Sequence, residues 1–292
     1  MSTQVLILEQ FTYTAPLGVR FWDVAAAAPA ESGLVVEAYP DLFPEQRTTA
    51  IVGHTGVYSF PLLPGLRNVA FGAGDDKFWS ANPPSIPYTI EVQDPEDRYL
   101  SYLFSTLLPV RGLFGLWASP LFVALTPDPT WLPLFSTPSR QLPNSNAFVR
   151  AQLQDDFSKV AASGAIVTVQ ATGLPLCAGL SDERGMVMVS QPYPEPVGNL
   201  VTSPLSAPNL VQQSWTVEVA VFYNEGKTHD PFPDLHQILQ QNAAFVWRDS
   251  AHTATVDQFT LQYGKDLVLR SLDSTSGNEL PELLVTSAGS PL

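Results

Sequence analysis

The chain has 292 residues, 45% of them hydrophobic, so it is long enough for two domains of ordinary size with packed cores. Only 14% of the residues are charged, and the formal net charge is −14, with 14 lysines and arginines that form no basic run. This balance argues against binding to nucleic acid or to anionic lipid head groups. Cys177 is the single cysteine, which excludes a disulfide within this sequence and every multi-cysteine zinc motif, and fits folding in a reducing compartment.

The N-terminal run, residues 1–11, lacks the basic region and the small-residue cleavage pattern of a signal peptide, so we expect a first strand there. The longest apolar stretch, Gly112 to Leu125, is interrupted by Pro120 and is too short to span a bilayer as a helix. We therefore expect no transmembrane segment and no secretion leader. Contact with a membrane surface is left open.

Proline spacing and residue type together predict strands. The 27 prolines are spread over the whole chain, which excludes an all-α protein because proline disrupts a helix interior. Between the prolines lie short runs rich in β-branched and aromatic residues, which are typical of strands. The clearest are residues 33–38, 57–60, 165–169, 186–189 and 215–221. The pattern predicts a mainly β protein of sandwich architecture.

Helical signals are few. Residues 230–247 carry the best one, with Pro233-Asp234 at its start and Leu235, Ile238 and Leu239 at helical spacing. Residues 146–164 fit either a helix or a strand over 147–153 followed by a loop, and the sequence does not decide between them.

The sequence "SGLVVEAYP", residues 32–40, is echoed by "SGAIVTVQA", residues 163–171. About twenty residues after each copy comes a turn glycine followed by an apolar strand, at Gly56 and at Gly185. These glycines are expected to provide the positive φ of a hairpin turn. Gly65, in the Pro-Gly turn that follows, has the same structural role, and Arg184 lies in the hairpin loop before Gly185. The repetition predicts two similar β-sandwich domains in tandem.

Two resemblances follow from these motifs. The stretch "FWDVAAAAPAESGLVVEAYP…HTGVYSFPLLPGLRN" resembles the carboxypeptidase regulatory-like, transthyretin-like fold, which implies a fold and no activity. The segments "DRYLSYLFSTLLPVRGLF", "PLFSTPSR", "FVRAQLQD", "GLSDERGMVMVSQPYPEP" and "QSWTVEVAVFYN" together resemble a protein group found among the components of phage-tail-like contractile injection systems. That resemblance implies a baseplate-associated or accessory structural subunit, and it implies no catalytic residues.

The segment from Leu107 to Phe135 is unusually apolar. One interpretation is a core between the two sandwiches, and the other is an anchor in a neighbouring subunit or at a membrane interface. We expect this segment, with the proline-rich loop at 83–87, to bury against another subunit. The candidate interface residues are Leu113, Phe114, Trp117, Phe122, Trp131 and Phe135.

The sequence offers little catalytic chemistry. It contains no nucleophile elbow, no phosphate-binding loop and no His-Glu-x-x-His motif, and Cys177 sits among apolar neighbours. A metal site would need His229, Asp230, Asp234 and His236 to converge, and helix capping explains these residues equally well. The acidic pairs at 75–76, 155–156 and 182–183 lack calcium-loop spacing. We expect no catalytic residues, no metal and no cofactor.

These observations predict two tandem transthyretin-like or immunoglobulin-like sandwiches followed by a C-terminal extension that contains a short helix. The expected boundaries are 1–106 for the first sandwich, 107–140 for a hydrophobic connector, 141–225 for the second sandwich and 226–292 for the extension, with residues 286–292 mobile.

The expected function is that of a non-enzymatic subunit of a contractile injection particle, assembled in the cytoplasm into a particle that is either released or membrane-anchored. Its partners would be baseplate, sheath or fibre components. The alternatives are a carbohydrate- or surface-binding module, in which Trp22, Trp79 and Trp131 stack on sugars, and an accessory domain of an enzyme.

Overall fold

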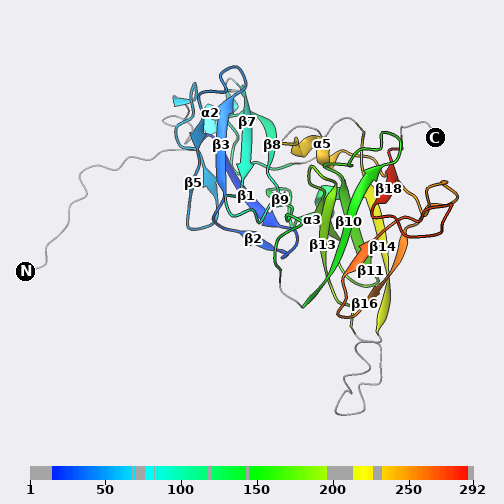
Figure 1. The fold of residues 1–292 in the computed structure, drawn as a ribbon. Coiled ribbons are helices and arrows are strands. Elements are labelled where there is room, and N and C mark those ends of the chain that lie inside the picture. The colour runs from blue at the N-terminus through cyan, green and yellow to red at the C-terminus, as the bar shows by residue number, and fades with distance from the viewer. Residues whose placement is uncertain are drawn as a thin grey trace, which may run out of the picture.

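The computed structural model describes residues 15–67, 69, 76–81, 83, 85–116, 120–142, 145–195, 213–225 and 232–288. Within these ranges the chain is mainly β, and Figure 1 shows two bodies of packed strands lying side by side. The predicted strand at residues 1–11 lies outside the described residues.

The first sandwich packs two sheets against each other. One has the order β2-β1-β6-β5, with β9 added parallel to β1, and the other has the order β4-β3-β7-β8. The strands that build these two sheets are β1 (Gly18–Asp23), β2 (Ala28–Ala30), β3 (Val35–Pro40), β4 (Thr48–Thr49), β5 (Ile51–Val52), β6 (Tyr58–Ser59), β7 (Ile86–Gln93), β8 (Tyr102–Leu108) and β9 (Trp131–Leu134). The helices α2 (Asp76–Ser80) and α3 (Pro120–Leu125) interrupt the connections.

The second sandwich also has two sheets. One has the order β13-β10-β18-β15, with β17 added parallel to β10, and the other has the order β12-β11-β14-β16. Their strands are β10 (Asn146–Asp155), β11 (Ile166–Ala171), β12 (Cys177–Leu180), β13 (Met186–Pro192), β14 (Ser214–Phe222), β15 (Phe245–Val246), β16 (Gln258–Gln262), β17 (Leu267–Leu269) and β18 (Leu283–Thr286). Residues 146–155 are therefore a strand, which decides between the two predictions for 146–164.

The two sandwiches repeat one topology. In the first, β1 pairs antiparallel with β6 and parallel with β9, and in the second, β10 pairs antiparallel with β13 and parallel with β17 and β18. The sheet order β4-β3-β7-β8 matches β12-β11-β14-β16 position by position. The echoed sequences at 32–40 and 163–171 correspond to β3 and β11, so the sequence repeat marks equivalent strands.

The turn glycines have the backbone geometry that the repeat predicts. Gly56 and Gly185 have φ of 71° and 74°, and Gly65 has φ of 75°. A β-carbon at Gly185 would overlap the carbonyl oxygen of Leu153, and one at Gly56 would lie 3.0 Å from Cα of Glu31. Both turns therefore need glycine for two reasons, the left-handed backbone and the close approach of a neighbouring chain segment.

Two of the expected boundaries need correction. The predicted connector, residues 107–140, contains β9, which pairs along β1 from Arg20↔Trp131 to Asp23↔Leu134, so most of it belongs to the first sandwich. The expected extension, residues 226–292, contains the short helix, and its strands complete the second sandwich by pairing with β10 and β14. Thr286, which was expected to be mobile, is a buried residue of β18. Both corrections have the same cause: the last strand of each sandwich pairs with the first, over a long sequence separation.

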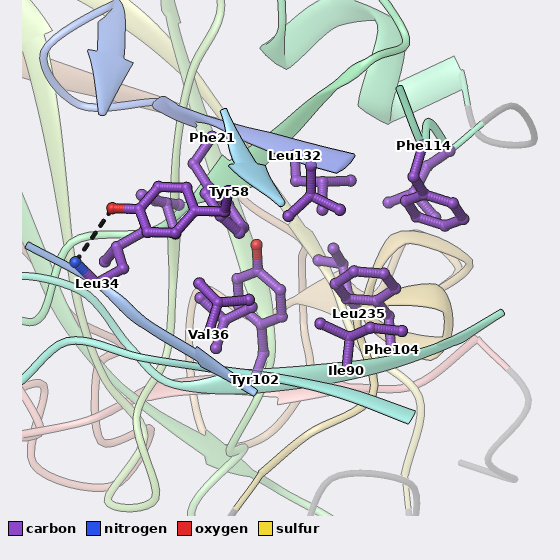
Figure 2. Close-up of a cluster of buried hydrophobic side chains, with 14 of the residues drawn as sticks. Phe21, Leu34, Val36, Tyr58, Ile90, Tyr102, Phe104, Phe114, Leu132 and Leu235 are labelled. Atoms are coloured by element: carbon purple, nitrogen blue, oxygen red, sulfur yellow. Dashed lines mark hydrogen bonds between the residues drawn. The ribbon is translucent and has the colours of Figure 1, made fainter. Parts of the chain in front are cut away.

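The short helix α5 (Leu235–Leu239) links the two sandwiches. It begins at Asp234, whose side chain accepts a hydrogen bond from the backbone amide of His236, and its Leu235, Ile238 and Leu239 are buried. Although α5 follows β14 in the chain, these residues join the hydrophobic cluster of the first sandwich, where Leu235 lies near Phe104 (Figure 2). Ile166, Ala178 and Leu180 of the second sandwich belong to the same cluster. The core of the first sandwich therefore extends to α5 and to these three residues, while the rest of the second sandwich has its own core, which includes Val167, Val219 and Leu283.

Candidate interaction surface

The apolar segment from Leu107 to Phe135 is partly core. Phe114 is 8% exposed and its ring stacks on that of Phe104 at a centroid distance of 4.9 Å (Figure 2), while Phe135 is fully buried. Leu113 is half-buried and packs against the start of β1, where its Cδ2 lies 3.4 Å from the position that a β-carbon on Gly18 would occupy. The prediction that Phe114 and Phe135 contact another subunit is wrong, because packing within this chain already covers them. Trp117 and the side chain of Phe122 lie outside the described residues.

Trp131 and Trp22 meet on neighbouring strands of the first sandwich. Their rings pack edge to face at 5.7 Å, and both are half-buried. The guanidinium of Arg20 lies 4.0 Å from the centre of the Trp131 ring and is held by Asp128 at 2.8 Å. One face of Trp131 is therefore occupied by a cation, which makes it a poor platform for a sugar ring. Trp79 lies apart from this pair, on α2, packed edge to face on Phe78 at 5.2 Å.

A different part of the first sandwich exposes large apolar side chains. At the end where β3 finishes and β7 begins, Leu42 is 80% exposed, Leu107 60%, Phe43 51% and Leu62 50%. We call these four residues, together with the exposed Pro87, the distal surface.

Backbone pairing brings the parts of the distal surface together. The amide of Asp41 donates to the carbonyl of Pro87 at 3.2 Å, and Pro87 is the register partner of Leu107 on β8. The hydroxyl of Tyr88 donates to the carbonyl of Pro64, which holds the 61–65 turn over the start of β7. Two loops and the paired ends of β7 and β8 therefore present apolar side chains at one end. Leu107 and Pro87 lie in the segments that were predicted to bury against a partner. The sequence did not point to Leu42, Phe43 and Leu62, because isolated loop residues give no periodic signal.

The candidate metal ligands have structural roles. Asp234 caps α5, and Nε2 of His236 lies 3.3 Å from the carbonyl oxygen of Ser105 on β8. His229 and Asp230 lie outside the described residues. Across the described parts of the chain, no group of three or more histidine, cysteine or acidic side chains is placed to hold a metal ion.

The acidic pair at 155–156 is also structural. Asp155 is fully buried and accepts a hydrogen bond from the Tyr223 hydroxyl at 3.3 Å. Asp156 lies 2.6 Å from both Lys159 Nζ and His252 Nε2. Asp182 closes the hairpin before Gly185 by accepting from the amides of Arg184 and Met186 at 2.9 and 2.8 Å. Asp75 lies outside the described residues.

Cys177 has the environment of a structural thiol. It is 8% exposed on β12, and burial raises the pKa of the thiol to about 11. A thiol with a raised pKa is a poor nucleophile at neutral pH, because the thiolate is the reactive form.

None of the helices that the structure describes is long and apolar enough to cross a bilayer. No protein-family model matches the chain, and no curated protein matches it. Among solved structures, the chain is similar to the shaft pilin SpaA of Lactobacillus rhamnosus GG, at 8% identity and a TM-score of 0.24, with 96% of this chain and all of that chain covered. It is also similar to a C-terminal fragment of the pilus adhesin SpaC of the same organism, at 12% identity and a TM-score of 0.20, with coverage of 94% and 99%. TM-scores of this size establish neither a common fold nor a common function.

Proposed function

We propose that the chain is a non-enzymatic structural subunit of a phage-tail-like contractile injection system, at or near the baseplate, and that its distal surface docks on a neighbouring subunit. The resemblance of several sequence segments to that group of proteins suggests the assembly. The exposure of Leu42, Phe43, Leu62 and Leu107 at one end of the first sandwich is the observation that carries the docking role.

The physical argument for docking is the hydrophobic effect. Burial contributes about 25 cal/mol per Å² of apolar surface, and exposed apolar patches on soluble proteins mark interaction sites. Only 14% of the residues of this chain are charged, so few charges compensate for the apolar end. The net charge of −14 disfavours both self-association and attraction to anionic lipid, and it favours a protein partner with a cationic rim around its apolar patch.

The packing of α5 into the first sandwich supports a scaffolding role. Leu235 and Ile238 of α5 pack into the first sandwich, while the strands that flank α5 in the chain belong to the second. A mechanical force on one sandwich would therefore act on the other through α5. A subunit that joins two neighbours benefits from such a rigid connection.

The test uses the tagged full chain expressed in the producing cell. Particles are isolated by sedimentation, and the amount of the chain per particle is measured by quantitative mass spectrometry. We expect the wild-type chain to sediment with the particle and the Leu42→Ser/Leu107→Ser variant to remain in the soluble fraction while melting at the wild-type temperature.

The matched control is Ile51→Ser/Val268→Ser, which changes two other exposed apolar side chains, at 61% and 46% exposure, outside the distal surface. It should enter the particle normally. A wild-type chain that never sediments with a large particle contradicts the proposed assembly, whereas normal incorporation of the Leu42→Ser/Leu107→Ser variant contradicts only the docking role.

A further inference from the structure

A cleft of about 680 Å³ lies between the two sandwiches, away from the distal surface. One wall is the turn at residues 97–101 between β7 and β8. The opposite wall is formed by residues 163–164 and by the 180–184 hairpin, while residues 137–139 and Pro233 complete the lining. Its size is that of ordinary small-molecule sites, which favour the junctions between domains.

The cleft is pre-formed, because both walls are fixed to each other. The amide of Leu103 donates to the carbonyl of Pro233 at 3.0 Å, and Leu180 belongs to the core that contains α5. The Gln241 side chain donates to the carbonyl of Gly164 at 2.7 Å, which ties the second wall to the end of α5. A ligand therefore need not order the site as it binds.

The carboxylates of Asp97 and Glu183 leave acceptor capacity unfilled in the cleft, and the exposed guanidinium of Arg184 leaves donors unfilled beside them. Among the described residues, no group donates to the Asp97 carboxylate, and the Glu183 carboxylate has only Arg184 at 3.9 Å, with both side chains at least 80% exposed. The Thr137 hydroxyl donates to the backbone carbonyl of Asp97 at 2.6 Å, and the Ser181 hydroxyl donates to the backbone carbonyl of Ala162 at 2.6 Å. The Thr137 oxygen can still accept, whereas the buried Ser181 oxygen already accepts from the amide of Ala165 at 2.8 Å. Thr137 and the two carboxylates therefore suit a ligand that donates hydrogen bonds.

The charges of the lining and the lack of a free strand edge restrict the class of ligand further. Asp97, Asp182 and Glu183 outnumber Arg184, which disfavours an anion. An extended peptide would need a free strand edge for main-chain pairing, but the lining is made of turns, and Leu180 at the end of β12 is buried. A ligand that carries a positive charge and many hydroxyl groups suits the acidic lining and needs no free strand edge.

We propose that the inter-sandwich cleft binds a short carbohydrate chain that carries protonated amino groups. The ammonium groups lie between the Asp97 and Glu183 carboxylates on opposite walls, and the sugar hydroxyls donate to Thr137 and neighbouring hydroxyl side chains. This inference is independent of the docking role of the distal surface.

The experiment is calorimetric titration of the full chain at low salt with three probes: a glucosamine trimer, an N-acetylglucosamine trimer and trilysine. We expect saturable binding of the glucosamine trimer, weakened by added salt, and weaker binding of the other two. Asp97→Asn and Glu183→Gln should each lower the affinity by about tenfold, since each removes a charge-assisted contact. Asparagine tolerates the positive φ of 53° at position 97, so this variant keeps its backbone.

The matched control is Glu45→Gln, which removes an exposed carboxylate outside the cleft and should leave the affinity unchanged. Thermal unfolding of each variant confirms that it is folded. The proposal is overturned if the glucosamine trimer does not bind at millimolar concentration, if trilysine binds as tightly as the sugar, or if both cleft variants bind like the wild type.

Discussion

The hydroxyl of Tyr99 donates a 2.8 Å hydrogen bond to Asp23, the last residue of β1, and Tyr223 donates the equivalent bond to Asp155, the last residue of β10, at 3.3 Å. All four residues are buried. Burial first, and then the Asp23 carboxylate, raise the pKa of Tyr99 to about 12, which keeps its hydroxyl protonated as a donor. The structural repeat therefore extends from strand order to one buried polar pair in each sandwich.

The first pair has an additional partner, Arg140, from the chain that leads to the second sandwich. Its Nη2 lies 2.6 Å from Asp23 Oδ2, and the Arg140 side chain is 14% exposed. Arg140→Ala leaves the buried carboxylate without its cation, so we expect a loss of about 3 kcal/mol in the free energy of unfolding, measured in urea. Arg184→Ala, at an exposed position, should change it by less than about 0.5 kcal/mol. A loss below about 1 kcal/mol for Arg140→Ala would show that this ion pair does not stabilise the junction.

Gly173 and Gly185 have nearly the same φ, so substituting each of them separates the cost of backbone strain from that of steric crowding. Gly173→Ala, at φ 78° with no atom within 4 Å of the new β-carbon, should cost about 1 kcal/mol. Gly185→Ala, at φ 74°, also drives the β-carbon into the Leu153 carbonyl, and should cost at least about 2 kcal/mol more. The difference in unfolding free energy between the two variants is the measurement. Equal costs would mean that the hairpin shifts to accept the methyl group.

Phe114 and Leu107 lie close in sequence and differ in burial, at 8% and 60% exposure. Phe114→Ala opens a cavity beside Phe104 and should cost about 3–5 kcal/mol. Leu107→Ala should change the stability by less than about 0.5 kcal/mol. Thermal melts of the two variants test the division of the 107–135 segment into core and surface, and similar losses for both would contradict it.

Asp94 links stability to acidic pH. Burial alone would raise the pKa of this carboxyl, but hydrogen bonds from Arg98 and from the backbone amides of Glu96 and Arg98 outweigh burial, and the pKa is lowered. A carboxyl with a lowered folded-state pKa stabilises the fold above its unfolded value of about 3.9, and this stability is lost as the pH falls through the folded-state pKa. Melting temperatures measured from pH 6 to pH 2.5 should fall less steeply for Asp94→Asn than for the wild type. Parallel curves would exclude this role.

Cys177 should react with a thiol reagent only after unfolding. The buried thiol has a pKa raised to about 11, so thiolate is scarce at pH 8, and β12 shields it from the reagent. We expect the modification rate of the native protein to lie at least about tenfold below that of the urea-unfolded chain. Comparable rates would place the thiol at the surface.

Local patterns in the sequence were sufficient for several features of the fold. The β-branched runs between prolines predicted strands, the Ser-Gly echo predicted the repeated sandwich, and the turns at Gly56 and Gly185 predicted positive φ. The strands and the turns depend on residues within about ten positions of one another, where turn chemistry and side-chain alternation act directly, and the echo needs only a comparison of two such local patterns. The limits of the helix were predicted less well, because α5 ends at Leu239 while the apolar pattern continues to residue 247.

By itself, the sequence determined a mainly β chain with two related halves, few charges and no recognisable catalytic motif. Tertiary structure alone decided that Phe114 is core while Leu107 is exposed, that β9 and β18 return to β1 and β10, and that α5 of the second half packs in the first. It also decided that Asp97 and Glu183 face one cleft. The physical reason for the strand pairings, the packing of α5 and the cleft is distance along the chain, because these contacts join residues about a hundred positions apart. For Phe114 and Leu107 the reason is that an apolar side chain carries no local mark of which partner will cover it.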